Sequence, residues 1–95
     1  MFDLAALKPE HFESLIGTKL PIVDTDFAFE LGAVERLVSP SPRGTAFSLI
    51  LLAPPQTRGD QGIYHLQHPE LGVLPLFLVP IDVQNGRTRF EAVLN

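Results

Sequence analysis

The spacing of apolar residues changes once along the chain, from a helical pattern near the N-terminus to strand-like alternation afterwards. Phe12 and Ile16 are about one helical turn apart and lie on one face of a predicted helix. Pro9 suits the first helical position, where a backbone N–H has no partner, and Gly17 suits the left-handed conformation that ends a helix. The pattern predicts a short helix over about residues 8–16, whose apolar stripe covers the open end or one face of a sheet.

After Gly17, apolar and polar residues alternate between closely spaced prolines and glycines. Alternation is typical of strands with one buried face, and the Pro and Gly clusters mark the turns between them. Gly32 interrupts the alternation of its segment, which indicates a β-bulge, and Asn85-Gly86 is the strongest hairpin signal in the chain. We therefore predict about six strands, over residues 20–24, 26–38, 46–53, 62–67, 73–81 and 87–94.

Short connections favour antiparallel pairing of consecutive strands, so we expect an up-and-down β-meander over about residues 20–94. In that order the Ser39–Gly44 and His68–Gly72 turns lie at one end of the sheet, and the Pro54–Asp60 loop and Asp82–Gly86 turn lie at the other. The predicted fold is a single mainly-β (α+β) domain over residues 1–95, with the helix packed on a curled antiparallel sheet. The sheet could be open or could close into a small barrel, which would remove its exposed strand edges.

Two of the predicted strands are apolar on both faces, at residues 49–52 and 76–79. A sheet with one solvated face needs apolar side chains on the other face only. Either the helix covers the second face, or part of that face docks another protein or a second subunit. We favour docking, and the expected interaction surface includes Ile50, Leu52, Phe77 and Val79.

The charge balance and the cysteine count exclude several classes of partner and site. The chain has 11 acidic and 7 basic residues, a net charge of −4, whereas nucleic-acid binding needs clustered Lys and Arg. No apolar stretch is long enough to span a bilayer, and Met1-Phe2-Asp3 lacks the basic region of a signal peptide. The absence of cysteine fits a reducing compartment. We expect a cytoplasmic protein that binds neither nucleic acid nor membrane.

One cluster combines residue types that bind metals, in the order His65, His68 and Glu70. Successive strand residues point to opposite faces, so His65 and His68, three positions apart, converge only if the strand ends between them. The favoured interpretation is structural: His68 bonds the backbone of the turn that Pro69 begins, and Glu70 lies in solvent. The alternative is a small-ligand or metal-binding barrel with Tyr64, His65, His68 and Glu70 near its mouth.

Catalytic motifs are missing from the sequence. There is no cysteine nucleophile, no nucleophile elbow around a serine and no glycine-rich phosphate loop that opens a helix. We therefore expect a non-enzymatic protein that needs no cofactor.

The second half of the chain carries a longer motif. Residues 61–72 read QGIYHLQHPELG, residues 76–81 read LFLVPI, and residues 90–95 read FEAVLN. This resembles a family of short bacterial proteins of unknown function that share a QGxYxLxHPxLGxLxLFLVPI core and a YEAVFN-like terminus. Phe90 stands where Tyr is usual, and Leu94 where Phe is usual. Members are often encoded near phage-tail-like genes, so the resemblance implies a partner in such an assembly, and it implies no activity.

Overall fold

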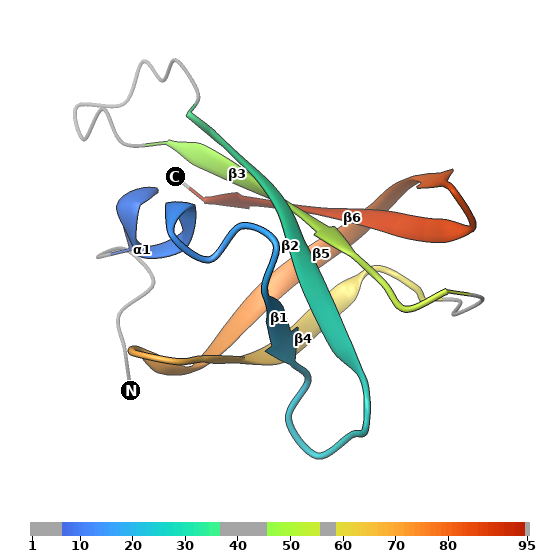
Figure 1. The fold of residues 1–95 in the computed structure, drawn as a ribbon, viewed down its shortest axis with the longest axis horizontal. Coiled ribbons are helices and arrows are strands. Elements are labelled where there is room, and N and C mark those ends of the chain that lie inside the picture. Colours follow the sequence, from blue (N-terminus) through green and yellow to red (C-terminus); the bar gives the residue numbers. More distant parts are fainter. Residues whose placement is uncertain (1–6, 37–45, 56–58, 95) are drawn as a thin grey trace.

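The computed structural model describes residues 7–36, 46–55 and 59–94, and it confirms a mainly-β fold with one short helix (Figure 1). All six strands form one antiparallel sheet in the order β1-β2-β3-β6-β5-β4. A bridge between Ile22 and Leu66 joins the end of β1 to β4, so the sheet is nearly closed as a barrel. The elements are α1 (Glu10–Glu13), β1 (Lys19–Pro21), β2 (Ala28–Arg36), β3 (Phe47–Leu52), β4 (Gly62–His68), β5 (Gly72–Gln84) and β6 (Arg87–Leu94).

The predicted up-and-down order is wrong at one place, because β3 pairs with β6 and not with β4. The register sets Leu49 beside Ala92 and Leu51 beside Phe90, and all four side chains are buried in one core. Gly59, in the connection after β3, lies against Phe90 at one end of the barrel, and the chain continues from there into β4. Adjacency of consecutive strands is a tendency, and here the apolar match between β3 and β6 overrides it.

Neighbouring strands still alternate in direction. For the described residues, the connections therefore lie at the ends of the sheet where they were predicted. Arg36 pairs with Phe47 at the end of the barrel where His68 pairs with Gly72. The Ser39–Gly44 turn itself lies outside the described residues. The Pro54–Asp60 loop, of which residues 56–58 also lie outside them, leaves β3 at the opposite end, where the Asn85-Gly86 turn lies.

The helix is shorter than predicted, and it closes an end of the barrel. The N–H of Leu15 donates to the carbonyl of Phe12 and the N–H of Thr18 donates to that of Leu15, so four-residue turns replace the helix after Glu13. Gly17 ends these turns with a φ of 90°. Phe12 is fully buried, with its ring 6.1 Å from that of Phe47.

Two local predictions about backbone conformation are confirmed. The register of β2 against β3 shifts between Leu31 and Ala33, which places a bulge at Gly32. Asn85 and Gly86 have φ values of 54° and 77°, the positive pair that a type I′ hairpin turn requires. The hairpin turn follows from two residues that tolerate a positive φ, which most residues avoid.

β5 changes its partner half-way along its length. Residues 72–78 pair with β4, and from Val79 onward the strand pairs with β6. In an antiparallel sheet, successive residues of a strand turn their N–H and C=O groups toward opposite neighbouring strands. Val79 pairs with Glu91 toward β6, so the ring nitrogen of Pro80 faces the β4 side, where it has no N–H to donate. The ladder with β4 accordingly ends at the pair of Gly62 and Leu78.

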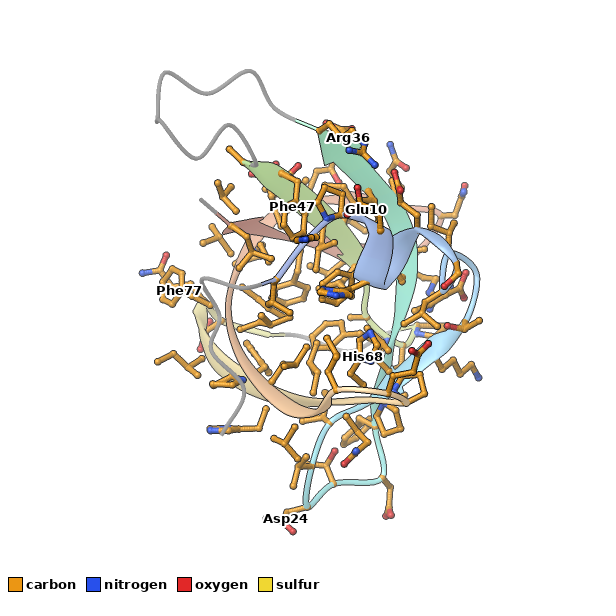
Figure 2. The ribbon with its side chains drawn as sticks, turned by 90° about the vertical axis from the view of Figure 1, so that its left-hand side faces the viewer. Glu10, Asp24, Arg36, Phe47, His68 and Phe77 are labelled. Carbon is orange, nitrogen blue, oxygen red and sulfur yellow. The ribbon has the colours of Figure 1, made fainter. Side chains whose placement is uncertain are left out.

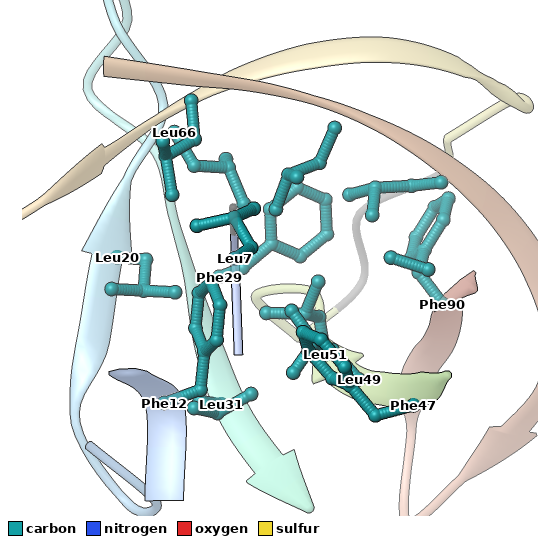
Figure 3. Packing of buried hydrophobic residues seen from close by; sticks show 14 of the residues in the cluster. Leu7, Phe12, Leu20, Phe29, Leu31, Phe47, Leu49, Leu51, Leu66 and Phe90 are labelled. Atoms are coloured by element: carbon teal, nitrogen blue, oxygen red, sulfur yellow. The ribbon is translucent and has the colours of Figure 1, made fainter. Parts of the chain in front are cut away.

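The inner face of the barrel holds a single hydrophobic core, to which every strand and α1 contribute (Figure 3). Phe29, Tyr64 and Phe90 pack edge to face at the end that the Pro54–Asp60 loop crosses. Gly59 of that loop passes so close that an added Cβ would lie 2.6 Å from Cζ of Phe90. The largest fully buried apolar side chains of the core are Phe12, Leu20, Leu31, Phe47, Leu49, Leu51, Leu66, Leu74, Leu76, Leu78 and Phe90.

Candidate functional site

The residues of the predicted metal cluster point in different directions. His65 is exposed on the outer face of β4, whereas His68 is 2 % exposed and points into the barrel end beneath α1 (Figure 2). Glu70 is exposed in the turn that follows. Among the residues that the structure describes, no group of three or more His, Asp or Glu side chains comes together to hold a metal ion.

His68 bonds the backbone at both ring nitrogens, as the structural interpretation predicted. Its Nδ1 accepts the backbone N–H groups of Glu70, at 3.0 Å, and Leu71, at 3.1 Å. An Nδ1 that accepts two donors carries no proton, so Nε2 carries it and donates to the carbonyl of His11 at 2.8 Å. The buried ring therefore joins the β4–β5 turn to α1, and its edge packs on the ring of Phe12.

Tyr64 lies toward the opposite end of the barrel from His68. Both side chains point inward, and four residues of strand separate them by about 13 Å. The Tyr64 hydroxyl donates to the carbonyl of Asp60 at 2.5 Å, and burial raises its pKa above the ordinary value, with a smaller contribution from the Asp60 carboxylate. The proposed mouth of Tyr64, His65, His68 and Glu70 is therefore wrong, because these residues do not face one space.

Two surface hollows lie elsewhere. One, of about 380 Å³, lies between the β1–β2 connection and the start of β6 and is lined by Lys19, Asp26, Phe27, Ala28, Pro54, Pro55 and Arg87. The other, of about 420 Å³, is a shallow groove along the seam of β1 and β4, lined by Leu15, Thr18, Lys19, Pro21, Gln67 and Pro69. Neither contains any of the four residues of the predicted ligand site.

The four residues of the predicted interaction surface fall into two groups. Ile50 is only 8 % exposed, between Ala33 of β2 and Glu91 of β6, and Leu52 is half-buried. Ser48, on the same outer face, is 1 % exposed, and its Oγ has no hydrogen-bond partner among the described residues. The prediction of a docking surface on β3 is therefore wrong. On β5, Phe77 is 54 % exposed and Val79 is half-buried.

Phe77 lies within a larger apolar surface on the outside of the β4–β5 hairpin. Its direct cross-strand neighbour is Ile63, which is 64 % exposed, and Val73 is 41 % exposed on the same side. We call this surface the hairpin face and define it by the six outward side chains of the paired segments: Ile63, His65 and Gln67 on β4, and Val73, Pro75 and Phe77 on β5. None of the six carries a fixed charge.

Ile63 was missed from the sequence, although a signal for it was present. Pairing outward from the His68–Gly72 turn places residue 63 opposite residue 77. The alternation of β4 then puts Ile63 outside, because Leu66 and His68 point inward. The register of the hairpin, counted from its turn, was therefore sufficient to identify the residue.

The outer face formed by β2, β3 and β6 carries charged side chains from β2 and β6, and both arginines of β6 are ion-paired. Arg87 bonds Glu30 at 3.0 Å and the carbonyl of Ala53 at 2.9 Å. Arg89 forms a bidentate ion pair with Asp82. The hydrogen bonds from the Arg89 guanidinium lower the pKa of the Asp82 carboxyl below its ordinary value. These pairs hold the start of β6 to its neighbours on both sides.

A third ion-paired group joins α1 to the barrel. Arg36, at the end of β2, bonds Glu10 at 3.1 Å and Glu13 at 3.0 Å (Figure 2). The pKa of Glu10 is lowered, first by its hydrogen bond to backbone and then by Arg36. All three side chains are largely exposed, so the group orients the helix more than it stabilises the fold.

A family model matches residues 7–94 and is described as a domain of unknown function, DUF6916. The chain belongs to this family. The match covers the helix and all six strands, in line with the resemblance to a short domain of unknown function. No curated protein and no solved structure matches the chain. Within the described residues, no helix is long and apolar enough to cross a membrane.

Proposed function

We propose that this family member is a non-enzymatic protein-interaction module whose docking surface is the hairpin face. The observation that supports the proposal most is the direct pairing of Ile63 and Phe77, two large apolar side chains that are each more than half exposed. Isolated exposed apolar residues are common on proteins, whereas a contiguous uncharged patch usually marks a contact site.

The rest of the barrel supports the proposal by contrast. Around the start of β6 the outward arginines are paired with carboxylates of β2 and of the far end of β5, which keep that surface hydrated. On the hairpin face, the only ionisable side chain is His65. An outward surface without fixed charge favours contact with a protein surface that is also apolar, since burying an unpaired charge against it would be costly. The resemblance to proteins encoded near phage-tail-like genes suggests a structural component of such an assembly as the wider setting.

Site-specific photo-crosslinking tests the proposal. A photoreactive phenylalanine analogue is introduced at position 77, or at exposed Glu35 of β2 as the matched control, in cells of the natural source. We expect defined protein adducts from position 77 and none of the same mass from position 35, with every adduct identified by mass spectrometry. The proposal also expects Ile63→Asn to remove the adduct from position 77. Absence of an adduct at position 77, or the same adduct from both positions, would contradict it.

A further inference from the structure

We infer that the hairpin face binds the hairpin face of a second copy of this chain, in a two-fold symmetric, reversible dimer. The inference rests on the proposed function, since it requires the hairpin face to be a docking surface. It adds the identity of the partner, which follows from the charge, the strand edges and the size of the surface.

The charge distribution selects an uncharged partner surface. Between Gln61 and Ile81 the one residue with a fixed charge is Glu70, and it lies in the turn and not on the hairpin face. The chain as a whole carries a net charge of −4, and the ion-paired side chains of β2, β5 and β6 lie outside the hairpin face. Contact of two hairpin faces brings no fixed charges together, and it pairs apolar side chains with apolar side chains.

The edge of β5 is unsuited to association through added strands, which leaves the face. The carbonyl of His65 accepts the N–H of Val23, so His65 turns its backbone groups toward β1. Its cross-strand partner Pro75 therefore turns its ring nitrogen away from β4, toward the edge of β5. A proline at an edge has no N–H to offer an incoming strand. Two copies consequently meet through side chains, as two sheets packed face to face.

The area of the surface predicts a weak dimer. A fully exposed side chain of this size offers about 150 to 250 Å². With Ile63 64 % exposed, Phe77 54 % and Val73 41 %, the hairpin face offers on the order of 500 Å² per copy when the polar members are included. Two copies would then bury about 1,000 Å² in total, which is the lower end of specific interfaces. The dimer should form and dissociate reversibly with concentration.

The test measures mass in solution by sedimentation velocity, over a concentration series that reaches the millimolar range. We expect the wild-type chain to move from 10.5 kDa toward twice that mass as concentration rises. Phe77→Asp and Phe77→Lys should each remain monomeric at every concentration, with circular dichroism spectra and melting curves like those of the wild type. Glu35→Gln, on the charged outer face, should dimerise as the wild type does. If either Phe77 variant fails to fold, Ile63→Asn replaces it.

Mixing the two charged variants distinguishes face-to-face contact from an indirect effect. In a two-fold dimer the hairpin faces oppose each other, so an equimolar mixture of Phe77→Asp and Phe77→Lys chains should associate at low salt although neither does alone. A wild-type chain that stays monomeric, or one whose dimer survives both charged substitutions, would overturn the inference. If the chain is monomeric and position 77 still crosslinks to a different protein, the inference of a second copy fails while the proposed function stands.

Discussion

β3 and β5 are apolar on both faces in sequence, yet the structure gives their outer faces opposite surroundings. β3 pairs along its whole length with β2 on one side and β6 on the other, and its outward Ile50 is 8 % exposed. β5 changes partner half-way, and its outward Phe77 is 54 % exposed. A two-sided apolar run can therefore have its outward side chains buried, as on β3, or exposed, as on β5.

β3 and β5 also differ in the charged residues that surround their outward side chains. Ile50 lies between Ala33 and Glu91, among strands that also carry the ion pairs of Arg87 and Arg89. Phe77 lies opposite Ile63 on a hairpin whose outward side chains carry no fixed charge. The outward Ile50 of β3 is buried in the monomer, whereas the exposed Phe77 of β5 belongs to the surface that we propose for docking.

Truncating one outward residue on each strand tests most directly whether the outer faces of β3 and β5 differ. We expect Ile50→Ala to reduce the free energy of unfolding by about 2 to 4 kcal/mol, because it leaves a cavity in a closed region. Phe77→Ala should change the monomer by about 0.5 kcal/mol or less, as is usual for exposed positions. Urea unfolding at low protein concentration measures both. Equal losses in the two variants would show that the outer faces do not differ.

His65 and His68 allow the same kind of test within β4, because His65 points outward and His68 points inward. We expect His68→Phe to lower the free energy of unfolding by about 2 to 3 kcal/mol, since the backbone N–H groups of Glu70 and Leu71 lose their acceptor. His65→Phe, on the exposed side, should leave the monomer nearly unchanged. Hydrogen exchange at those two amides provides a second measurement, and unchanged protection in His68→Phe would contradict the assigned bonds.

Gly59 and Gly62 test the end of the barrel that the long connection crosses. An alanine at position 59 would place its Cβ 2.6 Å from Cζ of Phe90, whose ring is held by Phe29 and Tyr64. We expect Gly59→Ala to cost about 1 to 3 kcal/mol of stability through this overpacking. Gly62→Ala meets no atom within 4 Å and serves as the control. Thermal unfolding of the two variants should separate them clearly.

The smallest expected effect concerns the exposed ion pairs of Arg36 and Arg89, which should respond to acid. The pKa values of Glu10 and Asp82 are lowered in the folded chain, so their contribution is present above the unfolded values of 4.5 and 3.8 and is lost as pH falls below them. The melting temperature should fall slightly over that range. Arg36→Gln combined with Arg89→Gln should flatten this dependence, whereas Phe77→Ser should not. An unchanged slope in the double variant would show that the pairs are not coupled to stability.

Local features of the fold were predictable because single residues dictate them. Gly32 marked the bulge, Asn85-Gly86 marked the hairpin, and Pro69 after His68 marked the turn that the imidazole bonds. The pairing of β3 with β6 was not predictable by the same means, because it depends on which apolar faces match across about forty residues of chain. The exposure of Phe77 likewise depends on what covers a face, and sequence alternation carries no information about that.

The crossing of the barrel end by the chain after β3 also has a consequence for how the protein folds. β4, β5 and β6 follow one another and can pair by closing short loops, whereas Phe47 must find Leu94 near the far end of the sequence. Closing a long loop costs more entropy than closing a short one, and topologies rich in distant pairings fold more slowly. The pairing of β3 with β6 should therefore limit the folding rate. Until that step is complete, the apolar inner faces of both halves remain in water.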